Sequence, residues 1–278
     1  MTSVFVGLVS HKDSPRQESQ GPYGLAQMLS DELSDLGFDT TSRVNTENAF
    51  TASGASLTAE VLATSPAEEL RIEKRWAGYL GIETTVSWRF TRTLRWLKYS
   101  VSRTTRPNIA AVVRLANIEL SHRDLLFQAL DMQFDWVVIL EDDARCIDPQ
   151  DLALGLAGII NGSSPPSLVS LSVSFTPEQL RVDHLLHPLP TETWPGTMGR
   201  TIMTTDKPIT NTVCANMYSG QFARVLHDEL AQLPFTPIAP IDWKVNQALM
   251  NLYGRRDIGS GDCWWLSPAP IIQGSMHP

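Results

Sequence analysis

Cysteine is scarce in this sequence: the 278 residues contain three, Cys146, Cys214 and Cys263, far apart along the chain. An odd number of widely separated cysteines fits neither a disulfide framework nor a zinc ribbon, since both need paired or closely spaced thiols. We therefore expect the protein to work in a reducing compartment, the cytoplasm.

Long apolar runs are also missing. The first run, at 4–9, soon meets His11, Lys12 and Asp13, so it is too short for the core of a signal peptide or for a membrane span. No GxGxxG or P-loop motif follows this run. The sequence therefore gives little support to a nucleotidyl- or phosphoryl-transfer enzyme. Secretion and membrane spanning are not expected.

Positive charge is in deficit overall, with 22 Lys and Arg against 30 Asp and Glu and a net charge of −8. This balance argues against a nucleic-acid partner, because such binding needs many cations to neutralise phosphates. Basic and aromatic residues nevertheless alternate between 75 and 99. That stretch fits either a core-facing aromatic stripe with a charged outer face or peripheral contact with an anionic membrane.

What is present predicts one α/β domain over 1–278. Hydrophobic residues make up 42% and charged residues 19% of the chain, which are ordinary globular values. A strand at 4–9, a helix at 25–36 and a strand at 38–44 form a βαβ-like start. We expect a mixed, mostly parallel central sheet flanked by helices, with a helical insertion at 46–106 and a mobile acceptor loop at 188–212.

Three carboxylates follow the sharpest strand pattern in the chain. The uninterrupted apolar run at 134–140 ends in Glu141, Asp142 and Asp143. Strand alternation directs Glu141 and Asp143 to one side and Asp142 to the other, at the edge where open α/β sheets bind ligands. Adjacent carboxylates repel one another unless a cation compensates, and oxygen ligands suit Mn²⁺ or Mg²⁺. The alternative is an acidic strand end that faces solvent.

The order of motifs resembles that of glycosyltransferase family 25, the lipopolysaccharide-type sugar transferases, within the GT-A superfamily. A Leu-Ser-His-Arg run at 120–123 opens a helical stretch, a strand follows, and Glu-Asp-Asp-Ala stands at 141–144. Looser matches extend the similarity from 114 to 273, while 46–106 departs from it. The resemblance implies a GT-A-like catalytic domain with a DxD-like motif.

The resemblance also implies roles for single residues. Asp143, helped by Glu141, binds the cation, and Asp142 contacts the donor ribose or sugar. Asp242, at a helix start, is the general base or holds the acceptor hydroxyl, although an Asp there also caps a helix. His277 is a late histidine of the kind that adds a metal ligand, or else belongs to a loose chain end.

Donor contacts are expected at two further places. Ser10 and His11 follow the first strand, where a GT-A enzyme receives the nucleotide base and ribose. Arg114 and Asn117 share a helical face with Ser121 and can direct polar groups at the donor; a solvated loop and an ordinary surface stripe are the alternatives.

The implied activity is hexosyl transfer from a nucleotide-diphosphate sugar, a UDP-sugar, to a hydroxyl of a glycan, a lipid-linked molecule or a small acceptor, with inversion. The alternative is a catalytically silent nucleotide-sugar-binding or scaffold protein of the same fold. Trp264 and Trp265 offer a stacking surface for a sugar or, alternatively, core residues. The expected location is the cytoplasm, with the inner membrane face as a second option.

Overall fold

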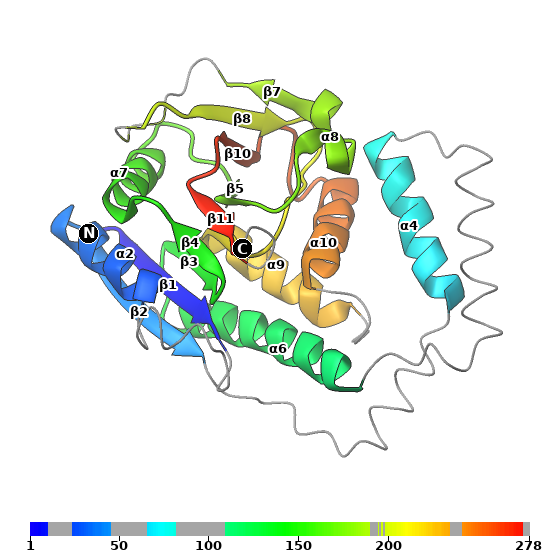
Figure 1. Cartoon of the computed structure of the whole chain (residues 1–278), viewed down its shortest axis with the longest axis horizontal. Helices are drawn as coiled ribbons and strands as arrows, with labels where there is room; N and C mark the ends of the chain where they lie inside the picture. The colour runs from blue at the N-terminus through cyan, green and yellow to red at the C-terminus, as the bar shows by residue number, and fades with distance from the viewer. Residues whose placement is uncertain are drawn as a thin grey trace.

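An eight-stranded sheet forms the centre of the computed structural model, which describes residues 1–10, 24–45, 66–81, 109–189, 194, 196, 198–233 and 241–274 (Figure 1). The strands lie in the order β2-β1-β3-β9-β5-β10-β8-β7. In the same order their bounds are Asp39–Asn45, Ser3–Val9, Trp136–Glu141, Ala215–Ser219, Leu168–Ser170, Cys263–Ser267, Thr201–Thr205 and Leu186–Pro188.

Six of these eight strands run in one direction, because only β9 and β8 are antiparallel to both of their neighbours. The parallel trio β2-β1-β3 forms the N-terminal half, and α2 (Gly24–Asp35) connects β1 to β2. The expected mixed, mostly parallel sheet of an α/β fold is confirmed, and so is the βαβ start.

Helices cover both faces of the sheet because its central strands are apolar on both sides. In β1, Val4 and Val6 pack into one core cluster, whereas Phe5 packs into the other. The first cluster includes α2 and α7 (Pro149–Ile160), and the second includes α6 (Ile109–Asp131), α9 (Gly220–Gln232) and α10 (Ile241–Arg255). Alternation along the strand thus supplies a separate apolar surface to each helical layer.

A second sheet of three strands stands at the edge where β3 ends. Its order is β4-β11-β6, and β4 (Ala144–Cys146) begins directly after Asp143. The sequence pattern predicts a single strand at 168–175, but the chain divides there into β5 and β6 (Ser172–Val173), so that prediction is wrong. Leu171, at the break, is buried and bonds to the backbone of Ala215 and of Ile271 in β11 (Ile271–Gln273).

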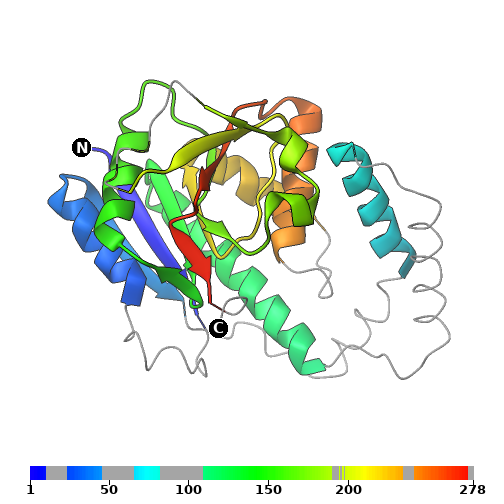
Figure 2. The same cartoon turned by 45° about the horizontal axis from the view of Figure 1, so that its top comes forward.

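One helix of the expected insertion at 46–106 belongs to the described part of the chain. It is α4 (Pro66–Leu80), which lies beside α10 in both views (Figures 1 and 2). Tyr79 of α4 packs edge to face on Tyr253 of α10. Residues 46–65 and 82–108 lie outside the described residues, so the extent of the insertion stays a prediction.

The segment 188–212 contains β8, which pairs with β10 and β7, so residues 201–205 are sheet. Its assignment as an acceptor loop stays a prediction. The short helices α8 (Pro177–Leu180) and η1 (Asp183–Leu185) precede it. None of the described helices combines the length and the apolar character needed to cross a bilayer.

Candidate functional site

The acidic triplet lies at the carboxyl edge of the parallel strands. Val9, the last residue of β1, pairs with Glu141 of β3 on one side and with Asn45 of β2 on the other. Ser10 follows Val9, and its backbone N–H donates to Asn45 O at 3.0 Å. Three strands therefore end together, and their last polar residues share one edge of the sheet.

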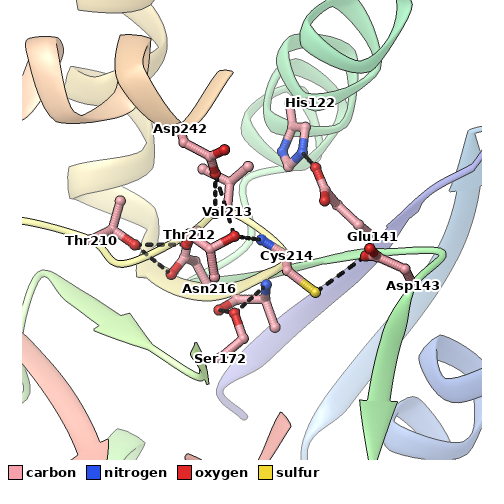
Figure 3. A network of polar contacts seen from close by, with 11 residues as sticks. His122, Glu141, Asp143, Ser172, Thr210, Thr212, Val213, Cys214, Asn216 and Asp242 are labelled. Atoms are coloured by element: carbon pink, nitrogen blue, oxygen red, sulfur yellow. Dashed lines mark hydrogen bonds and ion pairs between the residues drawn. The ribbon is translucent and has the colours of Figure 1, made fainter. Parts of the chain in front are cut away.

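Three potential metal-ligating side chains converge at this edge. A carboxylate oxygen of Glu141, a carboxylate oxygen of Asp143 and Sγ of Cys214 all lie within 4.8 Å of one another. The Cys214 thiol donates to Asp143 Oδ1 at 3.4 Å (Figure 3). Asp143 is 6% exposed and Cys214 is fully buried. Glu141 ends β3 and Asp143 follows in the turn before β4, so this turn, rather than strand alternation, brings their carboxylates together.

His122 belongs to the same group although the sequence pattern assigned it no role. Its side chain reaches from α6, and Nε2 lies 3.0 Å from Glu141 Oε1. The imidazole is buried, at 3% exposure. The signal that could have found it is the Ser-His motif itself, which places a polar ring in the second half of α6, a helix that packs against β1 and β3.

Cys214 was not singled out by sequence, because a lone cysteine inside an apolar run has no spacing pattern to identify it. Its position is fixed by the backbone: Cys214 N–H donates to Thr212 Oγ1 at 3.2 Å, and Glu141 N–H donates to Cys214 O at 2.8 Å. Burial raises the pKa of the Cys214 thiol well above its usual value, and the charges of Asp143 and Glu141 raise it further. The thiol is therefore a protonated donor in the metal-free protein.

Asp242 faces the same region from α10, of which it is the second residue. Its Oδ1 accepts the Val213 N–H at 2.7 Å and the Thr212 hydroxyl at 3.4 Å, so the carboxylate is held against the loop before β9 (Figure 3). Burial and, second, the charge of Glu141 raise the pKa of Asp242 to about 6. The bonds from Val213 and Thr212 and the nearby His122 act in the opposite direction.

Hydrogen bonds connect the ends of the three-stranded sheet near Asp143. The Ser174 hydroxyl donates to Gln273 Oε1, and the Gly274 N–H donates to Asp143 O at 2.7 Å. Asn211 Oδ1 accepts the backbone N–H of Ser174 at 3.0 Å. These bonds join the last described residues of the chain to the turn that carries Asp143.

The other predicted donor-site residues are placed only in part. Asn117 and Ser121 are buried in α6, and Asp142 is half-buried. The backbone of Arg114 belongs to α6, but its side chain lies outside the described part. His11 and His277 also lie outside the described residues.

Trp264 and Trp265 do not form a sugar platform. They are 5% and 7% exposed in β10, and their ring N–H groups donate to Gly261 O and Ile209 O. The core alternative is confirmed, because a central strand packed on both faces buries both rings.

Comparison with known proteins gave one kind of match. No protein-family model matches the chain, and no curated protein matches it. Among solved structures, the crystal structure of a glycosyltransferase involved in the glycosylation of the major capsid of PBCV-1 aligns over 95% of this chain and 81% of that chain, at 8% identity and a TM-score of 0.36. The sequence-based assignment to family 25 is not confirmed, and a TM-score this low does not establish a relationship.

Proposed function

We propose that this protein is a metal-dependent glycosyltransferase that moves a hexose from a nucleotide-diphosphate sugar, a UDP-sugar, to a hydroxyl acceptor with inversion. The observation that supports the proposal most directly is the convergence of Glu141, Asp143 and Asp242 at one sheet edge. Two carboxylates close together suit a divalent cation, and a third with a raised pKa suits proton transfer.

The residues present fit a divalent ion. Glu141 and Asp143 supply oxygen ligands, and the neighbouring Cys214 adds a third donor atom within 4.8 Å. Mn²⁺ or Mg²⁺ is the ion that the two carboxylates favour. When bound, such an ion stabilises the negative charge that develops on the diphosphate leaving group. Asp142 is proposed to contact the donor ribose or sugar.

His277 is proposed as an additional ligand on the basis of chain reach. The Gly274 N–H bonds to the carbonyl of Asp143, which fixes the start of the last segment beside the acidic pair. Three residues span at most ~10 Å when extended. A histidine three positions after Gly274 is therefore within reach of the ion.

Asp242 is proposed as the general base. With a pKa of about 6 it is mostly ionised at neutral pH and close to the working range of an efficient base. Oδ1 accepts the hydrogen bonds from Val213 and Thr212. We therefore propose that Oδ2 is the atom that removes the proton from the acceptor hydroxyl. Those two bonds orient the carboxylate so that the acceptor oxygen is activated as it attacks the sugar.

The donor is proposed to lie across the carboxyl ends of β1 and β3. Ser10 and His11 would meet the base and ribose, and Arg114, Asn117 and Ser121 would meet the donor from α6. The acceptor is proposed to bind at a surface that includes 188–212. It is a glycan, a lipid-linked molecule or a small molecule.

The test is calorimetric titration with UDP in Mn²⁺ and in a chelator. Mn²⁺ should raise the affinity, and Asp143→Ala should reduce that gain by about a hundredfold or more, because it removes an ion ligand. Asp228→Ala is the control, since that carboxylate is 68% exposed on α9 and lies outside the site. Equal affinity with and without the ion in the unaltered protein would contradict the proposal.

Release of UDP separates an enzyme from a silent binding protein. The wild type should release UDP from a bound UDP-sugar, slowly with water and faster with an acceptor, and Asp242→Asn should lose the faster reaction. A protein that binds the sugar nucleotide in Mn²⁺ but releases no UDP during a long incubation would be the non-catalytic alternative.

A further inference from the structure

The sulfur of Cys214 is placed where a metal ligand would be. Its Sγ and one oxygen from each of Glu141 and Asp143 form a compact triangle of donor atoms, no two more than 4.8 Å apart. The thiol donates to an acidic side chain, at Asp143 Oδ1. The sulfur therefore points into the acidic pair.

The distance between sulfur and oxygen agrees with shared coordination. Around a tetrahedral zinc ion, with Zn–S of about 2.3 Å and Zn–O of about 2.1 Å, neighbouring S and O ligands lie about 3.6 Å apart. Cys214 Sγ and Asp143 Oδ1 are 3.4 Å apart. An ion can thus replace the thiol proton between these atoms with little movement of either side chain.

Hydrogen bonds support two corners of this triangle. Cys214 stands at the start of β9, where its carbonyl accepts the Glu141 N–H at 2.8 Å and its N–H is bound by Thr212. His122 Nε2 contacts the Glu141 carboxylate at 3.0 Å, as imidazoles do when they orient a ligating carboxylate. The Cys214 backbone and the Glu141 carboxylate are therefore positioned by hydrogen bonds within the protein.

We propose that Cys214 is the third protein ligand of the ion held by Glu141 and Asp143, and that its thiolate makes this site favour thiophilic divalent ions such as Zn²⁺, Co²⁺ and Cd²⁺ over Mg²⁺. The inference rests on the metal site of the proposed function. On binding, the S–H bond breaks, the sulfur keeps the electron pair and bonds to the ion, and the proton passes to solvent. No oxidant or reductant is involved.

The test follows the ion rather than the reaction. Co²⁺ or Cd²⁺ is titrated into the metal-free full-length protein, and the near-ultraviolet absorption of a metal–thiolate bond is recorded. Cys214→Ser retains a hydroxyl that can bond to Asp143 but removes the soft ligand. Cys146→Ser and Cys263→Ser are matched controls, since these thiols lie outside the donor triangle.

We expect the thiolate band in the wild type and in both controls, and its loss in Cys214→Ser. The preference for Cd²⁺ over Mg²⁺, measured as the ratio of dissociation constants, should fall at least about tenfold in that variant. Circular dichroism of each variant verifies folding. A wild type without the band, or a band that survives in Cys214→Ser, would overturn the inference.

The failure of this inference is distinguishable from that of the proposed function. If Mn²⁺ raises the UDP affinity but no thiolate band appears, the proposed metal-dependent transferase is retained and Cys214 is not a ligand of the ion. If the thiolate band appears but no ion changes the UDP affinity, the metal site exists but does not take part in donor binding.

Discussion

At the residue scale, Asp242 combines an unfavourable environment with a proposed chemical role. Burial and the charge of Glu141 raise its pKa from 3.8 to about 6. The unfolded chain therefore ionises this group near pH 4, whereas the folded protein keeps the proton until about pH 6. The stability that Asp242 contributes is fully present below pH 3.8 and is lost as the pH rises through 6.

This linkage predicts that Asp242→Asn stabilises the fold at pH 8. The difference between 3.8 and about 6 corresponds to about 3 kcal/mol, an upper figure because the residue is partly exposed. Asparagine can still accept the Val213 N–H. In urea unfolding with a chelator present, the free energy of unfolding of the variant should exceed that of the wild type by about 1–3 kcal/mol at pH 8. This difference should become smaller toward pH 4. A gap that is constant with pH would contradict the assigned pKa.

At the element scale, one close approach joins α7 to the segment that precedes β8. A Cβ at position 155 would lie 1.9 Å from the Trp194 ring, so the packing leaves no room for a side chain larger than that of glycine. The Trp194 Nε1–H donates to Asp151 at 3.3 Å, and the Arg200 guanidinium lies 5.8 Å from the ring centroid. The contact anchors the segment that leads into β8.

We predict that Gly155→Ala destabilises the protein by about 1–3 kcal/mol, because the indole must move out of a packed position. Gly254→Ala in α10 is the matched control: nothing lies within 4 Å of its added Cβ, and alanine favours a helix by up to about 1 kcal/mol. Thermal unfolding should lower the melting temperature of the first variant and maintain or raise that of the second. A neutral Gly155→Ala would show that Trp194 does not pack there in solution.

At the scale of the whole molecule, a buried ion pair joins two of the helices on one face of the sheet. Lys244 of α10 donates to Glu119 of α6, and Arg123 lies 2.6 Å from the other oxygen of Glu119. Burial lowers the pKa of Lys244, and Glu119 partly offsets this effect. Lys244 stands two residues after Asp242 on α10, and Glu119 stands three residues before His122 on α6, so the pair links the two helices near the site.

Removing one partner should destabilise the global fold. Glu119→Gln leaves the Lys244 ammonium buried without its counter-charge, and we predict a loss of about 3–5 kcal/mol in urea unfolding. The double variant Glu119→Leu with Lys244→Met should recover most of that loss, because neither charge remains buried. A double variant at least as destabilised as Glu119→Gln would show that the two buried charges are not coupled.

The sequence by itself determined the N-terminal strand-helix-strand unit, the apolar strand that ends in Glu141, and the helices that carry His122 and Asp242. These are local properties: periodicity and strand alternation extend over a few residues and need no distant partner. The same local rules failed at 168–175, where bonds from Ala215 and Ile271 divide one predicted strand between two sheets.

Only the tertiary structure decided which residues share the site. Asp143 and Cys214 are 71 positions apart, and Glu141 and His122 are 19 apart. They meet because β9 inserts antiparallel beside β3 while α6 packs behind it. Strand pairing and helix packing depend on the burial of extended apolar surfaces. A local residue pattern does not indicate which of these surfaces will pack against each other.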